Sequence, residues 1–455
     1  RRETQYDKDK PHFINLDRTI AGIDTGYSPR RMHSTTNLGN RLMSETIHIE
    51  TLPNGLVVLG QEMHHVASAS LMIRTGMCSA RDPLGGGGAS SVGSEWWQRG
   101  AGDYDSRAIA DAFDQLGCRQ SSASSREFTM FAGSMLGRNL PEVLNLYGDV
   151  TRRPRLEDEH FAPCRDLVAQ ELGSLDDMPA RKAACMAYEQ FLPDPYGRFV
   201  EGTPETLATL TADGLREHLL SQLTPQGTVI ALAGRFDFPE VLKWITEQFG
   251  DWEGEALPEI ATTPAPGGFV HEAKDSAQTH IAFAFPGVTA VDPEYYAELV
   301  ALTVLSGGTS SRLFSEVREK RGLVYHVSTK AGGTKDHPAL MTYAASVPEK
   351  VQETLDVIVA EIRKLTDGIT AEELARAKTQ LKSSLIMDCD STGMRSTRLA
   401  AHWMTRGAVM TLEESKARVD AVTADDVHAY LVGHPAANFA GAFIGPEMPD
   451  LSALQ

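Results

Sequence analysis

The chain has few cysteines, and they are not spaced for a disulfide framework or a structural zinc site. They are odd in number, scattered along 455 residues and form no C-x-x-C pair: Cys78, Cys118, Cys164, Cys185 and Cys389. Such usage is typical of a reducing compartment, and we expect a cytoplasmic protein. The first residues, RRETQYDKDKPHF, contain no apolar stretch, so they do not have the form of a secretory signal. Because Arg1 is not a methionine, removal of a leader stays open.

Long hydrophobic runs and an excess of basic charge are also absent. No apolar run reaches the roughly 20 residues that a membrane-spanning helix requires. The 43 Lys and Arg against 61 Asp and Glu give a net charge of −18, which argues against nucleic acid or a membrane as partner. The acidic balance is compatible with basic peptides. What is present, 42% hydrophobic and 23% charged residues, is ordinary for a soluble globular protein.

The sequence divides into a tail, two long segments and a linker. Residues 1–44 are polar and rich in Arg, Asp, Pro and Thr, which predicts a mostly irregular tail. Strand-like alternation begins at SETIHIETLPNGLVVLGQE. The Pro- and Gly-rich stretch GEALPEIATTPAPGG, residues 254–268, interrupts the pattern and predicts a linker. We therefore predict one domain over 45–253 and another over 269–455.

The two domains repeat each other in sequence. LTADGLREHL (210–219) matches VTADDVHAYL (422–431), and each is followed by a proline and an apolar strand ending in glycine. Thr211 and Thr423 are predicted helix N-caps, because a threonine hydroxyl accepts a hydrogen bond from the first helical turn. A repeat of about 210 residues predicts two copies of one α+β domain, each large enough to bury its own core.

Two motifs and the repeat resemble the insulinase/pitrilysin peptidases, also called inverzincins, in their two-domain form similar to subunits of mitochondrial processing peptidase. The motifs are SGGTSSRLFSEVREKRGLVYHV and the segment from SSASSREFT to DPYGRFVEGTPETLATLT. The resemblance covers about residues 45–448. It implies an α+β fold of the LuxS/MPP-like metallopeptidase type. Two homologous domains, each a mainly antiparallel sheet packed against helices, would face each other around a chamber.

Active relatives carry H-x-x-E-H on a helix and a third ligand about 76 residues further on. Over this motif, the segment 84–107 places Ser91 at the first His, Ser94 at the general base and Glu95 at the second His. Glu171 matches the third ligand. Cys164 stands where relatives place an acidic residue. Serine hydroxyls are poor zinc ligands, and Ser94 is not a base near neutral pH. A decayed site is favoured over an unusual metal site, and we expect this chain to bind no metal.

Other features of this segment have structural interpretations. Gly88 and Gly93 weaken the helix that would hold the site. Trp96 and Trp97 are aromatics of the kind that bury against a core or a partner. His160 and His218 are expected on the surface of helices rather than at a metal.

The second domain keeps its motif intact. In the relatives, an Arg and a Tyr seven residues later hold the scissile carbonyl and its developing oxyanion; here they are Arg318 and Tyr325. Periodicity alone would favour an exposed helix Arg and a half-buried strand Tyr. The flanking SSRLF and GLVY favour the functional interpretation.

The resemblance also implies that substrate adds as a β-strand to one edge of the first domain. The matching stretch is 117–129, with its centre at these residues: Ser121, Ser122, Ala123 and Ser124. A polar edge protected from aggregation is the alternative.

Together these features favour the non-zinc subunit of a heterodimeric zinc metallopeptidase. Its partner would be a homologous zinc-bearing subunit, and its substrate an unstructured peptide. Zinc is then expected on the partner and no cofactor on this chain. Two alternatives stay open: an inert structural or scaffold subunit of a larger complex, and a peptide-binding protein that does not cleave.

Overall fold

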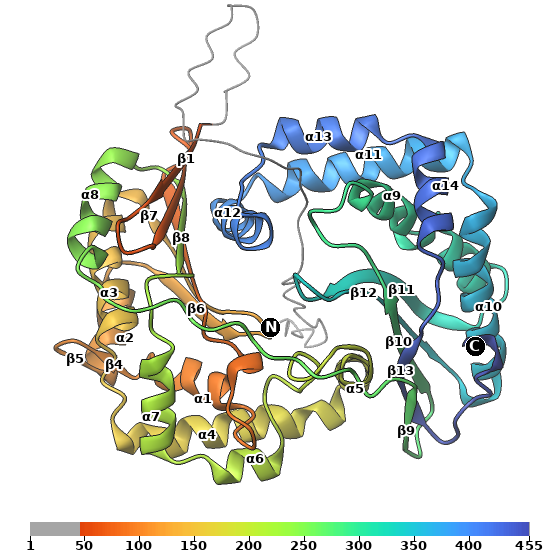
Figure 1. Ribbon diagram of the computed structural model, residues 1–455, viewed down its shortest axis with the longest axis horizontal. Coiled ribbons are helices and arrows are strands. Elements are labelled where there is room, and N and C mark those ends of the chain that lie inside the picture. Colours follow the sequence, from red (N-terminus) through yellow and green to blue (C-terminus); the bar gives the residue numbers. More distant parts are fainter. Residues whose placement is uncertain (1–45, 455) are drawn as a thin grey trace, which may run out of the picture.

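The computed structural model describes residues 46–454, and the tail predicted over residues 1–44 lies outside this range. Two sheets stand side by side, the first drawn in red to green and the second in green to blue (Figure 1). Each sheet carries its own layer of helices on the side away from the other sheet (Figure 1). The α+β class with mainly antiparallel sheets packed on helices is confirmed.

The first sheet has six strands in the order β1-β2-β8-β3-β7-β6. Their bounds are β1 (Ile47–Thr51), β2 (Val57–Glu62), β3 (Ser68–Thr75), β6 (Arg119–Ser124), β7 (Thr129–Leu136) and β8 (Val229–Gly234). Only β2 and β8 pair in parallel; the other neighbours are antiparallel. A separate two-stranded ribbon is formed by β4 (Gly100–Ala101) and β5 (Tyr104–Asp105).

The second sheet has five strands in the order β9-β13-β10-β12-β11, which is the order of β2-β8-β3-β7-β6 in the first. Their bounds are β9 (Phe269–Ala273), β10 (Thr279–Pro286), β11 (Val324–Gly333), β12 (Pro338–Ser346) and β13 (Ala440–Gly445). The one parallel pair, β9 with β13, falls at the equivalent place. Strand order and direction therefore repeat along with the sequence.

Helices fill the connections between strands. The first half contains α1 (Ala89–Trp96), α2 (Ser106–Gln115), α3 (Leu140–Arg152), α4 (Asp158–Gly173), α5 (Pro179–Phe191), α6 (Pro204–Thr209), α7 (Ala212–Ser221) and α8 (Phe238–Phe249). The second contains α9 (Tyr295–Ser306), the π-helix η4 (Phe314–Glu319), α10 (Val351–Lys364), α11 (Ala371–Asp388), α12 (Thr392–Arg406), α13 (Leu412–Ala421) and α14 (Ala424–Gly433). Short 3₁₀ turns occupy η1 (Ser79–Arg81), η2 (Gly137–Asn139), η3 (Ser174–Asp177), η5 (Pro348–Lys350), η6 (Leu365–Asp367) and η7 (Ser452–Leu454).

The predicted caps are present. The hydroxyl of Thr211 accepts a hydrogen bond from the Gly214 amide at 3.3 Å, and that of Thr423 accepts one from the Asp426 amide at 3.1 Å. Each cap satisfies an amide that the first helical turn leaves without a helical partner.

Each sheet buries one face in the main apolar core of its own half. The first core contains the inward side chains of α1, α2, α3, α7 and α8, and the second those of α9, α10 and α14. Both cores are continuous clusters of fully buried aliphatic and aromatic residues. Each half therefore has the core that the repeat predicts.

The opposite face of each sheet is covered by a helix from the other half. On the first sheet, Leu399 and Ala400 of α12 join a cluster with Val57, Leu59 and Met72. The second sheet receives α5, whose residues Ala183 and Ala187 are fully buried against Ala282, Ala284 and Ala339. Figure 1 shows α12 beside β7 and β8, and α5 beside β10 and β13. The two halves thus exchange a helix.

The segment 254–268 contains no helix or strand, as a linker would. It is nevertheless held against the first half. Thr263 exchanges two backbone hydrogen bonds with Asp194, at 3.0 and 2.9 Å, and Arg81 donates to the carbonyl of Pro258 at 2.7 Å. The predicted domain boundaries stay predictions, since α5 and α12 pack across them.

Candidate functional site

Ser91 and Ser94 lie on α1, one turn apart, and both are buried, 8% and 5% exposed. Each hydroxyl donates to a backbone carbonyl: Ser91 to Val200 at 2.8 Å and Ser94 to Ser91 at 2.9 Å. A serine hydroxyl has one proton to donate, so these bonds satisfy both side chains within the protein. They act as polar core residues in a helix that carries no imidazole.

Glu95 and Glu171 approach each other from α1 and α4. The pKa of Glu171 is raised, first by partial burial and then by the nearby charges of Glu95 and Glu201. Arg181 of α5 opposes this shift and forms an ion pair with Glu201, which is buried. The structure thus places Glu171 within reach of the charge of Glu95. It also adds a fixed cation, Arg181, which no local pattern indicated.

Cys164, on α4, is buried and adjoins the same group. Burial raises the pKa of its thiol, and a hydrogen bond from Arg99 lowers it in part. Arg99 also lies 3.8 Å from the Glu95 carboxylate. The segment therefore offers two hydroxyls bonded to carbonyls, a neutral thiol and carboxylates facing arginines. This donor set does not fit zinc, which prefers imidazole nitrogens, thiolates and unpaired carboxylates in tetrahedral sites.

The glycines of this segment have a packing role that the sequence prediction missed. Gly88 caps α1 at φ +88°, and a Cβ there would lie 2.5 Å from the carbonyl oxygen of Glu201. A Cβ on Gly93 would lie 2.4 Å from a methyl carbon of Leu219 on α7. Trp96 and Trp97 are fully buried, as expected. The absence of a side chain at Gly93 lets α7 pack closely against α1. Its absence at Gly88 does the same for the loop before α6.

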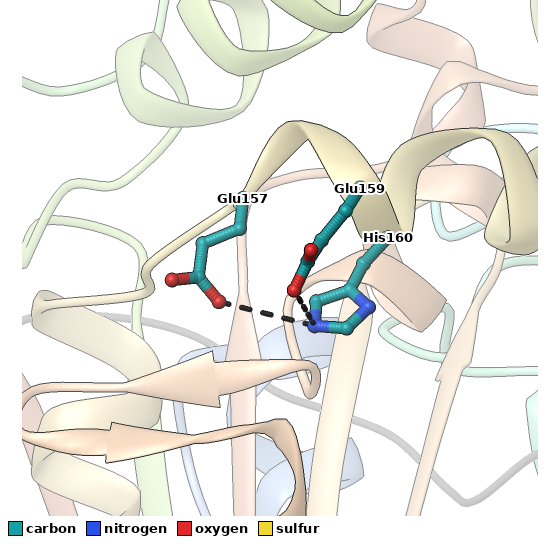
Figure 2. Close-up of side chains that lie close together, drawn as sticks. All are labelled: Glu157, Glu159 and His160. Carbon is teal, nitrogen blue, oxygen red and sulfur yellow. Dashed lines mark ion pairs between the residues drawn. The ribbon is translucent and has the colours of Figure 1, made fainter.

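Figure 2 shows the one group of three metal-ligand side chains found among residues 46–454: Glu157, Glu159 and His160 at the start of α4. The His160 ring nitrogen lies 3.8 Å from the Glu157 carboxylate and 3.6 Å from that of Glu159. Arg155 already pairs with Glu157. We interpret the group as ion pairs at a helix N-terminus, where acidic side chains are favourable.

His218 departs from its prediction. Its side chain on α7 is only 14% exposed and lies 3.8 Å from the buried carboxylate of Asp82. Burial lowers the pKa of His218 and raises that of Asp82 to about 7. The helix packs this face inward, so the surface location predicted for His218 is wrong.

Arg318 and Tyr325 lie together on the surface of the second half. The guanidinium carbon of Arg318 is 4.8 Å from the centre of the Tyr325 ring and 4.7 Å from that of Phe314. Tyr325 is 79% exposed. Among residues 46–454, the Arg318 guanidinium has no hydrogen bond or ion pair beyond these ring contacts. Its N–H donors are therefore available at the surface, stacked on aromatic rings that hold their orientation.

Two backbone irregularities produce this arrangement. Arg318 lies in the π-helix η4, a local widening of the helix that is frequent at functional sites. In β11, Val324 pairs with Ser346 and Val327 with Ala344, so β11 carries one extra residue, a β-bulge. Both valines are buried while Tyr325 and His326 between them are exposed. The bulge breaks strand alternation and turns both side chains outward.

His326 belongs to the same surface. Its ring lies 6.1 Å from that of Tyr343, whose hydroxyl is 2.8 Å from Nδ1 of His280. Partial desolvation of the ring by its neighbours, followed by the positive charges of Lys330 and Arg318, lowers the pKa of His326. A neutral imidazole next to Tyr325 can both donate and accept hydrogen bonds near pH 7.

The predicted edge strand is an edge in the structure. Strand β6 pairs with β7 alone, so its other side is the end of the sheet. Its residue Ser122 faces the end of α1, where Gln98, just after the helix, donates to both the Ser122 hydroxyl and the Ser94 carbonyl. The edge strand β6 and helix α1 are therefore neighbours. We call α1 the altered metal helix, because it carries serines where the relatives have the H-x-x-E-H motif. No hydrogen bond, ion pair or ring contact between described residues joins them to Arg318 or Tyr325.

Comparison with known proteins agrees with this geometry. A family model described as insulinase, peptidase family M16, matches residues 56–195, and a second, described as peptidase M16 inactive domain, matches residues 209–381. The chain belongs to the insulinase (M16) family. This M16 protein is also similar, at low identity, to curated relatives along most of its length.

An uncharacterized zinc protease of Streptomyces coelicolor is 28% identical over 395 residues, 84% of this chain and 86% of its own. The uncharacterized zinc protease YmxG of Bacillus subtilis is 26% identical over 410 residues, 87% of this chain and 97% of its own. These names describe the relatives. In this chain, α1 carries Ser91, Ser94 and Glu95 in place of the H-x-x-E-H motif.

Solved structures share the fold. A peptidase M16 inactive domain from Pseudomonas fluorescens superposes with a TM-score of 0.78 at 20% identity, covering 89% of this chain and 99% of its own. A protease from Helicobacter pylori gives a TM-score of 0.80 at 17% identity, covering 88% and 100%. Across the part of the chain that the structure describes, no helix has both the length and the apolar character needed to cross a bilayer.

Proposed function

We propose that this M16-family chain is the non-zinc subunit of a heterodimeric zinc metallopeptidase. It contributes Arg318 and Tyr325 to a site whose metal is held by a homologous partner. The observation that carries the proposal is the Arg318–Tyr325 stack, exposed and preorganised, in a molecule whose own metal helix presents buried serines.

The exposure of Tyr325 and the lack of a carboxylate partner for Arg318 among residues 46–454 support this role. A guanidinium without a carboxylate partner loses no ion pair when it turns to a substrate carbonyl. The phenol of Tyr325, 79% exposed, can donate a second hydrogen bond. Two donors directed at the same oxygen stabilise the negative charge that forms on it when the peptide carbonyl is attacked. In the free subunit, stacking on Phe314 and Tyr325 holds the arginine in place.

Peptide binding is assigned to the edge of the first half. The open side of β6 presents backbone donors and acceptors to an extended chain, and Ser121 to Ser124 are small enough not to obstruct pairing. Zinc, bound by the partner, supplies the activated water for hydrolysis. This chain then orients an unstructured peptide and stabilises charge.

The first test replaces the pair. The full chain is purified with a candidate partner that carries H-x-x-E-H, and cleavage of an unstructured peptide is measured. Arg318→Ala and Tyr325→Phe are each expected to lower the turnover of the complex by about 10²–10³, the usual cost of losing one oxyanion donor. Assembly, followed by size-exclusion chromatography, and zinc content are expected to be unchanged.

Arg321→Ala is the matched control, because Arg321 lies on the same segment but pairs with Glu316 at 2.7 Å. It is expected to leave turnover unchanged. Full activity of the Arg318 and Tyr325 variants would refute the proposal and favour an inert scaffold subunit. Binding of peptide without cleavage by any complex would favour a peptide-binding protein. Stoichiometric zinc in the isolated chain would also contradict the proposal of a non-zinc subunit.

A further inference from the structure

A cavity of about 320 Å³ lies at the seam between the halves. Its wall comes from the end of β3 with η1, the β6–β7 turn, the loop after α5, the turn before β8, the linker, the β11–β12 connection and α12. Its volume is within the range of sites that hold a small molecule or a few peptide atoms. The proposed oxyanion pair and the altered metal helix do not line it.

The charge of this cavity is opposite to that of the protein. Arg74, Arg81 and Lys335 line it with one carboxylate, that of Glu127. The chain as a whole carries −18. Apolar side chains such as Phe128 and Leu257 form the rest of the wall. Cations in an apolar concave wall attract a carboxylate more strongly than cations on an open surface do, because less water screens them.

The cations are held by the surrounding structure. Arg74 is 5% exposed, and its guanidinium carbon lies 4.1 Å from the centre of the Phe128 ring. Arg81 donates to the linker carbonyl of Pro258 at 2.7 Å. The Lys335 amide donates to Glu127 at 2.8 Å, which ties the second half to the β6–β7 turn. The Lys335 ammonium forms no ion pair with any residue of the 46–454 range.

The position of the cavity relates it to the edge strand. Glu127 and Phe128 belong to the turn that follows β6, and β6 ends at Ser124. An extended peptide paired along β6 opposite Ser122 would reach this turn after about two or three residues, at roughly 3.3 Å per residue. A side chain or chain end of that peptide would then enter the cavity.

We infer that this cavity is a specificity pocket for a carboxylate of the bound peptide, with Arg81 and Lys335 as its principal contacts and Arg74 as the buried charge behind them. The carboxylate belongs either to an Asp or Glu side chain or to the peptide C-terminus. This inference rests on the proposed binding of peptide at β6. The protein would then prefer peptides that carry a carboxylate at this position. The net charge of −18, taken alone, would favour basic peptides instead.

The test measures binding of fluorescein-labelled decapeptides to the full chain by fluorescence anisotropy. One set carries a single Glu at successive positions of a neutral, C-amidated sequence, with Gln at the same positions as reference. A second set carries no acidic side chain and has either a free or an amidated C-terminus. We expect at least about a fivefold tighter Kd for Glu over Gln at one or two neighbouring positions, or for the free over the amidated terminus. The preference is expected to weaken as salt rises.

Arg81→Gln and Lys335→Gln are expected to abolish that preference while leaving the affinity for the neutral peptide unchanged, and Arg81→Lys to restore part of it. Lys243→Gln, at an exposed site on α8, is the matched control and is expected to retain the full preference. Equal binding of acidic and neutral peptides, or a preference that both Gln variants retain, would overturn the pocket alone. Absence of binding by every peptide would overturn peptide binding at β6 and this inference with it.

Discussion

At the scale of single residues, the altered metal helix is a satisfied polar core. Ser91 and Ser94 donate to carbonyls of the protein, and neither hydroxyl is left without a partner. Across from them, Arg181 pairs with Glu201 and offsets part of the rise in the pKa of Glu171 that burial and the charges of Glu95 and Glu201 cause. A guanidinium thus supplies positive charge next to carboxylates that a metal site would use as ligands. Glu201 is buried while Arg181 is exposed, so removing the arginine would leave a buried carboxylate without its ion-pair partner, which is destabilising.

The buried carboxyl of Asp82 is expected to make the stability of the fold depend on pH. Its carboxylate accepts from the Ser90 amide at 2.9 Å and is buried, and burial raises its pKa from 3.8 to about 7. Between these values, the folded protein retains a proton that the unfolded chain has released. The stability contribution of Asp82 is therefore fully present below about pH 4 and is lost as pH rises through 7.

Asp82→Asn keeps the acceptor oxygen but does not ionise. Relative to wild type, it is expected to gain stability from pH 4 to pH 8, by an amount on the order of a few kcal/mol. Urea unfolding midpoints at several pH values measure the difference. An identical pH dependence in the two proteins would contradict the assignment to Asp82.

At the scale of elements, close helix approach outweighs helix propensity in α1. Gly93 is unfavourable in a helix interior by about 0.5–1 kcal/mol relative to alanine. Its position against Leu219 of α7 nevertheless leaves no room for a methyl group. Local irregularities of two elements also account for the contact between Arg318 and Tyr325, because a π-helix positions the first and a β-bulge the second. Regular elements with the same seven-residue spacing would not fix that contact.

Gly93→Ala is therefore expected to destabilise the protein by about 1–3 kcal/mol, since overpacking of the α1–α7 contact exceeds the gain in propensity. Thermal or urea unfolding measures it. Gly433→Ala, in the last turn of α14 with open space around it, is the control and is expected to be neutral or stabilising. Equal stabilisation by both substitutions would show that α1 does not need the glycine.

At the scale of the molecule, exchanged helices connect the two halves. Helix α12 covers the inner face of the first sheet, and α5 covers that of the second. Both contacts bury apolar side chains, including the alanines of α5 that allow the helix to lie close to the sheet. The linker makes backbone bonds to Asp194 and Gln190 of the first half, and the carbonyl of Gly268 accepts one from the Gly441 amide of the second. Association of the halves therefore depends on the helices more than on chain continuity.

A cut in the linker tests this arrangement. A protease site inserted between Glu259 and Thr262, cleaved after folding, is expected to leave the two fragments together on size-exclusion chromatography in dilute buffer. Ala187→Asp, which would bury a charge at the α5 contact, is expected to weaken that association. Separation of the cleaved wild-type fragments would contradict a connection made by the exchanged helices.

Much of the fold was predictable because its signals are local. The caps at Thr211 and Thr423 and the alternation of the strands depend on neighbouring residues, and the structure has them at the expected places. The repeat of about 210 residues is read by comparing the sequence with itself, and the repeated strand order agrees with it. The exposed location of β6 at the sheet edge also follows the prediction. The inward orientation of His218 was missed because it depends on Asp82, far away in the chain.

The sequence by itself determined that α1 carries no imidazole and that Arg318 precedes Tyr325 by seven residues, because residue identity and spacing do not depend on packing. Only the tertiary structure decided that Arg181 lies near Glu171, that helices cross between halves, and that Arg81 and Lys335 share a cavity. These contacts join residues that are distant in sequence. Their geometry is set by how two sheets and a linker bury apolar surface together, which no local pattern encodes.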